Sequence, residues 1–379
     1  MVNANKKAMG IIFPNSFDAL VSEMVNLRCM ASLPFASRYR LVDFLLSSMS
    51  NCGIDNVAIL PNRNYLSLME HIGTGREWDL ARKNGGVHIF PPYAENGTKF
   101  SNGRLSSIVN ILRYLKQQTE KYVVMCDSNI AANFDFNAMI DAHVKSGADV
   151  TIAYNVQSLP ESFLNSEDVN KDYYYSFDID YGRVTEIHVN QTVGVHNLSM
   201  NIFVIERELL IKLAKEAFDH GLTHFTRDVL WAQRQTLNIQ AYEFKGYAAR
   251  IYSINSYFEE NMKLLEEENL DGLFGSAPVY TKIRDDNPTR YISGSKAEHV
   301  MIADGCVIEG EVEDSILFRG VKVGKGAKVK NCILMQDSVI EAGAEVEYII
   351  ADKEVTISAG KEMKGTDSYP VYIVRGYTV

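Results

Sequence analysis

Residues 323–363, VGKGAKVKNCILMQDSVIEAGAEVEYIIADKEVTISAGKEM, decide the fold of the C-terminal part of this 379-residue chain. A glycine flanked on both sides, three residues away, by an aliphatic side chain recurs in them every 17 residues, and a related run lies 21 residues earlier. A second aliphatic series interleaves with the first and keeps the 17-residue spacing. The first series is IADGCVI (302–308), VGKGAKV (323–329), IEAGAEV (340–346) and ISAGKEM (357–363), and the second is VEDSILF (312–318), VKNCILM (329–335) and VEYIIAD (346–352).

This repeat is typical of hexapeptide β-helices, in which three short parallel strands complete a triangular coil of roughly 18 residues. The aliphatic side chains then point inward, and the glycines occupy the tight turns between strands. An ordinary β-meander is the alternative, but it gives no reason for two interleaved series of one period. We therefore expect a parallel β-helix over 296–379, which serves assembly or regulation rather than catalysis.

Residues 1–270 have a different texture, because apolar strand-like runs alternate with helix-like segments. This β-α-β rhythm predicts an α/β domain with a mostly parallel sheet covered on both faces. Residues 271–295 are rich in Gly, Pro, Ser and Asp, which favours an ordered connection between the two domains. The expected strands are 8–13, 56–60, 121–126, 148–154 and a hairpin of 173–180 with 183–189, and the expected helices are 40–53, 64–73, 104–118, 136–147 and 253–270.

Composition argues against several classes of function. The net charge of −10 and the lack of a basic block argue against a nucleic-acid partner. No apolar run reaches the roughly 20 residues of a membrane span, and the N-terminal apolar run is too short for a signal peptide, so we expect a cytoplasmic protein without a membrane partner. The five cysteines form no CxxC pair and the eight histidines show no zinc-ligand spacing, which predicts buried thiols and no metal site.

The run PFASRYRLVDFLLSSMSNCGI (34–54) resembles a signature of the ADP-glucose pyrophosphorylase (glucose-1-phosphate adenylyltransferase) family, in which Phe-Gly-Gly-Lys-Tyr-Arg leads into an Ile-Asp-Phe helix. The resemblance implies a nucleotidyltransferase-like α/β domain followed by a left-handed β-helix. It also implies the reaction of ATP with glucose 1-phosphate to give ADP-glucose and pyrophosphate, which begins bacterial glycogen biosynthesis. Further runs follow in family order: LSMNIFVI (198–205), HFTRDVL (224–230), SINSYFEENM (253–262) and ADGCVIEG (303–310).

Most residues that the family uses for this chemistry are replaced. No glycine occurs between Gly10 and Gly53, although the family has a glycine-rich phosphate loop after its first strand. Met30 stands where the resemblance implies a phosphate-binding lysine, and Asn129 and Arg250 stand where it implies two Mg²⁺-binding aspartates. A neutral amide is a poor Mg²⁺ ligand and a guanidinium repels the ion. We therefore expect a degenerate site and no cofactor in this chain.

Three residues are candidates for residual ligand binding. Asp127 follows the strand 121–126, and two residues separate it from Asn129, so it could restore a metal site. Arg227 and Asp228 replace a Lys-Asp pair of the family, and they either hold a phosphate or sugar hydroxyl or cap a helix. Arg250 could itself supply the positive charge that a metal supplies elsewhere in the family.

Basic residues near the family signature are candidates for an anion site. Arg38 matches the lysine of the signature, and Arg28 and Arg40 lie close to it in the sequence. The resemblance implies a sugar-phosphate effector, and guanidinium groups suit its recognition. The alternative is that Arg40 pairs with Asp43 on the helix and that Arg38 is a surface residue.

These observations favour a non-catalytic or weakly catalytic subunit, similar to the GlgD-type regulatory subunit of Gram-positive bacteria. It would modulate a homologous catalytic subunit within a heterotetramer, and that partner would bind the Mg²⁺. One alternative is an active nucleotidyltransferase with a site rebuilt from Asp127, Asp228 and Arg104. Another is a scaffold or ligand sensor that keeps only the fold, because fold alone does not establish function.

Overall fold

The computed structural model describes residues 7–92, 103–158, 174–191, 193–222 and 224–379. The chain divides into two compact units. The sheet unit comprises Met1–Ala19, Leu45–Ser128 and Phe134–Gly246, and the β-helix unit comprises Leu20–Phe44, Asn129–Asn133 and Tyr247–Val379. The expectations for the first six residues and for Tyr173, at the start of the predicted hairpin, lie outside the described residues.

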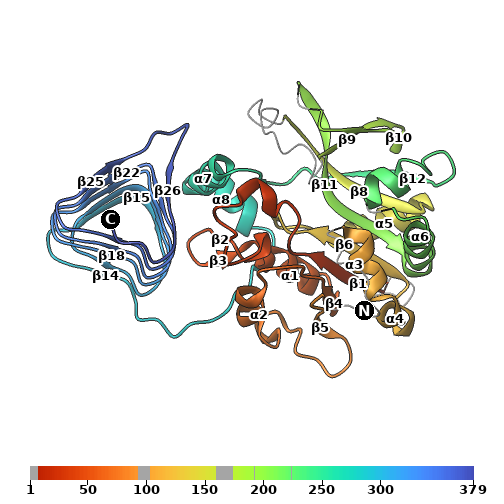
Figure 1. The fold of residues 1–379 in the computed structure, drawn as a ribbon, viewed down its shortest axis with the longest axis horizontal. Coiled ribbons are helices and arrows are strands. Elements are labelled where there is room, and N and C mark those ends of the chain that lie inside the picture. The colour runs from red at the N-terminus through yellow and green to blue at the C-terminus, as the bar shows by residue number, and fades with distance from the viewer. Residues whose placement is uncertain (1–6, 93–102, 159–173, 192, 223) are drawn as a thin grey trace. The chain divides into compact units, whose positions relative to one another are not determined.

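A nine-stranded sheet forms the centre of the sheet unit (Figure 1). Among its described strands, β10 and β11 run against the direction of the others, so the expected mostly parallel sheet is confirmed. Strands β1 and β6 are buried at every position, as in a sheet covered on both faces. In spatial order the strands are β5 (Gly86–Ile89), β4 (Asn56–Ile59), β1 (Ala8–Phe13), β6 (Tyr122–Asp127), β11 (Val195–Glu206), β8 (Val150–Ser158), β12 (Ile239–Glu243), β10 (Arg183–Val189) and β9 (Tyr175–Asp180).

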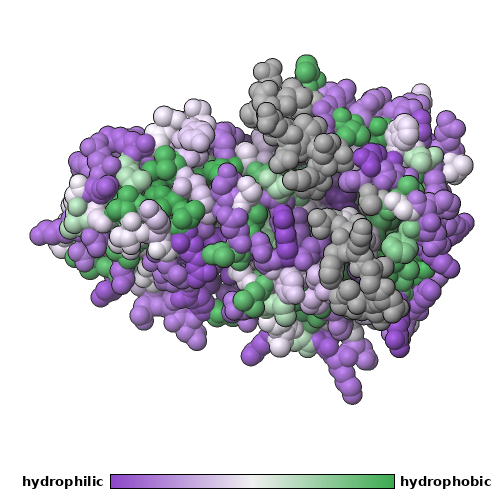
Figure 2. All heavy atoms as spheres, in the orientation of Figure 1, coloured by the Kyte–Doolittle hydropathy of each residue, from purple (hydrophilic) through white to green (hydrophobic). Residues whose placement is uncertain are grey.

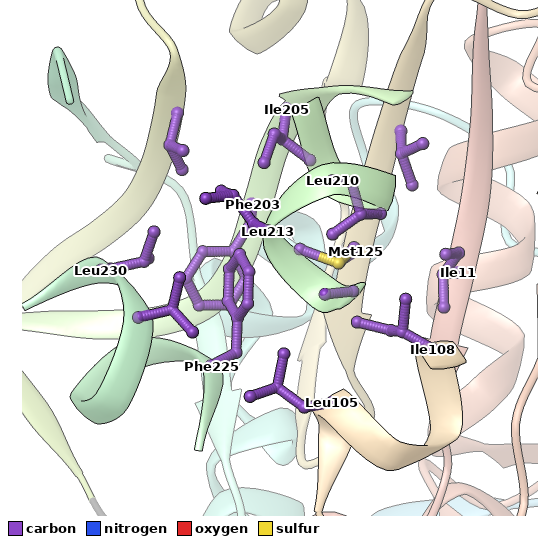
Figure 3. Packing of buried hydrophobic residues seen from close by; sticks show 14 of the residues in the cluster. Ile11, Leu105, Ile108, Met125, Phe203, Ile205, Leu210, Leu213, Phe225 and Leu230 are labelled. Atoms are coloured by element: carbon purple, nitrogen blue, oxygen red, sulfur yellow. The ribbon is translucent and has the colours of Figure 1, made fainter. Parts of the chain in front are cut away.

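Helix α6 (Arg207–Asp219) shows how the sheet is covered. Its buried aliphatic residues recur at helical spacing, and Figure 3 shows Leu210 and Leu213 beside Met125 of β6. Phe225, in the π-helical turn Phe225–Leu230, meets Phe203 of β11 edge-on with ring centroids 5.7 Å apart. The other helices up to residue 246 are α1 (Leu41–Asn51), α2 (Leu66–Ile72), α3 (Arg104–Asn110), α4 (Leu112–Gln117) and α5 (Phe136–Ser146), with 3₁₀ turns at Asp18–Val21, Met30–Ser32 and Arg76–Trp78.

Two expected helices are interrupted in the structure. The segment 104–118 is two helices, because α3 ends at Asn110 and the chain bends at Ile111 before α4 begins. The segment 253–270 is also split, because Glu266 has extended backbone angles between a 3₁₀ turn and α8 (Glu267–Phe274). No helix in the described ranges is long and apolar enough to cross a membrane.

Residues from 290 onward form the expected parallel β-helix, whose coils stack with a triangular outline in Figure 1. Every strand pairing within it is parallel. The strands are β14 (Arg290–Tyr291), β15 (Lys296–Ile302), β16 (Val307–Ile308), β17 (Glu311–Leu317), β18 (Lys322–Val323), β19 (Lys328–Lys330), β20 (Ile333–Leu334), β21 (Val339–Ile340), β22 (Glu345–Glu347), β23 (Ile349–Ala351), β24 (Thr356–Ile357), β25 (Glu362–Lys364) and β26 (Val371–Ile373).

The 17-residue repeat corresponds to one coil. Val329 pairs with Val346, and Val346 pairs with Met363 in the next coil, so residues 17 apart stack within one wall. The first spacing of 21 residues is not a coil: Val323 stacks on Ile308, 15 residues before it, rather than on Ile302. The earliest coil is therefore shorter than the repeat suggests, and IADGCVI (302–308) is out of phase with the later runs.

The β-helix unit also contains the family signature and the last helices. The hydroxyl of Tyr257 in α7 (Ile254–Met262) donates to the carbonyl of Pro34 at 2.6 Å. Pro34 begins the short hairpin of β2 (Pro34–Phe35) and β3 (Tyr39–Arg40). A second small hairpin pairs β7 (Ile130–Ala132) with β13 (Ala248–Arg250). Three segments that are distant in sequence thus pack together with the β-helix in one compact unit.

Candidate functional site

The glycine-free loop after β1 is closed by its own side chains. Phe17 has a left-handed backbone, with φ of 66°, and its buried ring stacks on that of Tyr174 with centroids 4.9 Å apart. The amide of Asn15 donates to the carboxylate of Asp18 at 2.8 Å and to the carbonyl of Arg63 at 2.9 Å. Aromatic and acidic groups therefore stand where the resemblance implies backbone donors to phosphate.

Asp127, the candidate for restoring a metal site, is paired with a cation inside the sheet unit. Its Oδ1 accepts from Arg104 Nε at 2.9 Å and from Ser16 Oγ at 2.8 Å, and its Oδ2 pairs with Arg104 Nη2. The Asp127 side chain is fully buried and that of Arg104 is 18% exposed. A guanidinium bound to both oxygens cancels the charge and occupies the lone pairs that Mg²⁺ requires.

Asn129 and Arg250, which replace the two aspartates, belong to the β-helix unit. Strand β6 ends at Asp127, so Asn129 lies beyond that strand, and its fully buried amide donates to the carbonyl of Ile251 at 3.3 Å. Arg250 pairs with Ile130 in the small hairpin, and its side chain is 1% exposed. Neither side chain offers an anionic oxygen.

The residues present do not fit Mg²⁺. The Asp127 carboxylate is neutralised, and the two substituted positions carry an amide and a cation. Across the part of the chain that the structure describes, no three His, Cys, Asp or Glu side chains cluster as a metal would require. Met30, at the position of the phosphate-binding lysine, is fully buried as a packing residue.

Arg227 and Asp228 lie in the π-helical turn, and Asp228 caps it. One carboxylate oxygen of Asp228 accepts from the backbone N–H of His224 at 2.9 Å, and the other accepts from Arg227 Nε at 2.7 Å. Burial, helped by Arg227, lowers the pKa of His224, which favours the neutral ring. Of the two interpretations offered by the sequence, the cap is the one for which the structure gives hydrogen bonds.

Arg28, a candidate for the anion site, is instead bound to Asp352 inside the β-helix unit. Its Nη2 contacts the two oxygens of Asp352 at 2.7 and 2.8 Å, and the side chains are 4% and 3% exposed. Asp352 also accepts from the Tyr372 hydroxyl at 2.6 Å and from the Lys353 N–H at 2.7 Å. Burial and Asp352 raise the pKa of Tyr372, so its hydroxyl remains a donor. Arg28 therefore holds the unit together, and its charge is already neutralised.

The other two candidate arginines differ from Arg28. Arg38 pairs with Asp304 at a site where both side chains are more than a third exposed. The backbone N–H of Arg40, rather than its guanidinium, donates to Asp43 at 2.9 Å. The Arg40 side chain is half-buried near Lys353, a residue that the sequence analysis did not single out.

Lys353 is an unusual cation. Burial first, and then the charges of Arg40 and Arg28, lower its pKa to about 7. Arg375 adds a further cation, although Glu354 pairs with it at 2.7 Å. A group of cations that depress one another's protonation favours binding of an anion, which would relieve the repulsion. The only sequence signal was the Asp352-Lys353 pair, which interrupts an aliphatic run of the repeat.

The loop of the family signature keeps an unusual backbone. Ala36 and Ser37 stand where the resemblance implies Gly-Gly, and both have left-handed φ values, 50° and 60°. Such a conformation costs a residue with a Cβ roughly 1–2 kcal/mol. The Ala36 N–H donates to the side-chain oxygen of Asn261 in α7 at 3.1 Å, which helps to hold it. The glycine geometry has thus outlasted the glycines.

Comparison with known proteins agrees with both halves of this description. Residues 29–163 match the family described as nucleotidyl transferase, and residues 283–369 match that described as GlmU-like, C-terminal hexapeptide. The glycogen biosynthesis protein GlgD of Bacillus subtilis (strain 168) is 32% identical over 86% of this chain and 83% of its own length. GlgD of Geobacillus stearothermophilus is 35% identical with the same coverage. The glucose-1-phosphate adenylyltransferase of Geobacillus stearothermophilus is 31% identical over 86% of this chain and 84% of its own length.

Proposed function

Because this chain belongs to the ADP-glucose pyrophosphorylase (glucose-1-phosphate adenylyltransferase) family and is similar to its GlgD members, we propose that it acts in glycogen biosynthesis as a regulatory subunit. It has little or no adenylyltransferase activity alone. It modulates a homologous catalytic subunit, most simply within a cytoplasmic heterotetramer. That catalytic subunit, and not this chain, binds the Mg²⁺ that the reaction needs.

One observation carries the proposal: Arg104 occupies both oxygens of Asp127, the carboxylate with which this chain could have rebuilt a metal site. Adenylyl transfer depends on cations placed around the phosphates, and a metal ion is the usual one. The nearby loop supports the proposal, because Phe17 and Asp18 place a ring and a negative charge where phosphate would lie. The intact β-helix suits assembly.

Reconstitution tests this function. A tagged form of the chain, co-expressed with a glucose-1-phosphate adenylyltransferase from the same cell, should co-purify with it. The mixture should differ from the catalytic subunit alone in its rate or effector response. An untagged chain and an unrelated β-helix protein are the controls. Failure to co-purify, together with unchanged kinetics of the catalytic subunit, would reject the regulatory role and favour a scaffold or sensor outside this pathway.

We also propose that a sugar-phosphate effector binds at Arg38, Arg40 and Lys353 rather than at Arg28. Because an anion beside Lys353 raises its pKa from about 7, effector binding near pH 7.5 should take up about three quarters of a proton. Calorimetry with glucose 1,6-bisphosphate, in buffers of low and high ionisation enthalpy, measures this uptake. Lys353→Met should abolish it, whereas Lys322→Met on another wall should not. Equal enthalpies in both buffers for the unaltered chain would contradict the proposal.

The same group makes stability depend on pH. The folded pKa of Lys353, about 7, lies below the ordinary value of 10.5, so between these values the unfolded chain binds more protons. The contribution of Lys353 to stability therefore rises as the pH increases through this window. Effector binding should flatten that rise.

We propose, finally, that the β-helix coils in the left-handed sense. The match to a hexapeptide family supports this, as does the repeat of short strands joined at glycine turns. A crystal structure would decide the hand directly.

A further inference from the structure

The last coil of the β-helix leaves a strand edge open. Strand β25 pairs with β22 along one edge, and within residues 224–379 no strand pairs with its other edge. The neighbouring β24 differs, because the Thr356 N–H donates to the carbonyl of Tyr377 at 2.9 Å and the Val379 N–H donates back to Thr356 at 3.0 Å. An open edge of a sheet is a template for pairing with another chain.

Apolar side chains surround this open edge. Met363, Val371 and Val379 are half-buried and pack against the aliphatic core of the β-helix from its last coil. Val374 and Tyr377 in the following tail are 48% and 57% exposed. Figure 2 shows hydrophobic side chains gathered over the coils, on the side where Figure 1 marks the C-terminus. The end of the β-helix thus presents the core itself, with charged residues only at its rim.

The sequence of β25 is its own complement. It reads Glu362-Met363-Lys364, with Met363 facing the core and the two charged residues exposed on the outer surface. In an antiparallel pair centred on Met363, Glu362 of one copy lies opposite Lys364 of the other, and the reverse holds across the two-fold axis. Opposite charges in directly facing positions stabilise such a pair, and like charges destabilise it.

From this register we infer that a second copy of this chain docks end to end on the last coil. The two β25 strands form one continuous antiparallel ladder, and the two aliphatic cores meet across a two-fold, isologous interface. The contact is small beside the roughly 20–30 residues a side of a standard interface, so dimerisation through it alone is weak and depends on concentration. The inference is independent of the proposed regulatory role, since it concerns self-association only.

Disulfide cross-linking tests the register directly. In Met363→Cys the two new thiols face each other across the axis, and facing residues of an antiparallel pair have the Cα separation that a disulfide accepts. The five native cysteines are buried, so they give little background. Mild oxidation of the full-length variant should yield a covalent dimer, whereas Lys325→Cys, on an exposed turn of an earlier coil, should yield none. If Met363→Cys remains monomeric on a denaturing gel, the register is wrong.

Charge reversal gives a second measurement that leaves the core intact. Lys364→Glu or Glu362→Lys alone places like charges in both facing pairs, and should weaken self-association in sedimentation equilibrium roughly ten-fold. The double variant Glu362→Lys/Lys364→Glu restores the complement and should recover the original dimerisation. Lys325→Glu is the matched control. A double variant as weak as the single ones, or cross-linking seen only with a homologous catalytic subunit present, would overturn the inference.

Discussion

The purified chain, supplied with Mg²⁺, ATP and glucose 1-phosphate, is expected to form ADP-glucose at least about a thousand-fold more slowly than an ordinary enzyme turning over roughly ten times per second. Loss of a single preorganised charge-stabilising group costs about 10²–10³ in rate. Here a whole metal site is affected, because Asp127 is neutralised by Arg104, and Asn129 and Arg250 offer no anionic oxygen. Pyrophosphate release measured over hours is the assay.

Two controls make this result interpretable. A homologous catalytic subunit purified in the same way should be active, which validates the assay. Asp127→Asn in the present chain should leave any trace of activity unchanged, because a contaminant and not this site would produce it. Turnover between about 1 and 1,000 per second, lost in Asp127→Asn, would instead establish an active nucleotidyltransferase with a rebuilt site.

Asp352→Ala is expected to lower the free energy of unfolding of the β-helix unit by about 3–5 kcal/mol. The substitution leaves Arg28 as a buried cation without its carboxylate, and it removes the acceptor of the Tyr372 hydroxyl. Urea denaturation followed by circular dichroism measures the loss. The exposed Glu354–Arg375 pair in the same part of the β-helix supplies the control, since Glu354→Ala should cost less than about 1 kcal/mol.

A paired substitution separates the charge from its surroundings. Arg28→Met combined with Asp352→Leu removes both charges, and replacement of a buried ion pair by apolar residues of similar volume is often close to neutral. The double variant should therefore be more stable than Asp352→Ala alone. If Asp352→Ala is no less stable than Glu354→Ala, the buried ion pair is not what holds Arg28 in this unit.

The elements that the sequence could predict are those set by local period. Val329 and Val346 stack in neighbouring coils because each coil repeats a fixed length, so the register follows from counting. Buried strands such as β1 show as continuous apolar runs. The break at Glu266 has no such signal, because the helical apolar pattern continues through it while the backbone becomes extended.

The candidate site was less accessible to sequence reasoning. Asp127 and Arg104 were both singled out, yet their 23-residue separation does not reveal that each neutralises the other. Arg28 was assigned to an anion site because its charge suits phosphate, whereas its actual partner is 324 residues away. Ion pairing depends on tertiary contacts, and a list of charges along the chain does not say which of them meet.

The Arg28–Asp352 contact also has a consequence during synthesis. Ribosomes add about 5–20 residues per second, so the 324 residues between the two side chains take roughly 16–65 s to make. Throughout that interval Leu20–Phe44 has left the ribosome, but the coil that completes its unit does not yet exist. The nascent chain, rather than the finished protein, is therefore the form in which a chaperone or a homologous subunit can reach this segment.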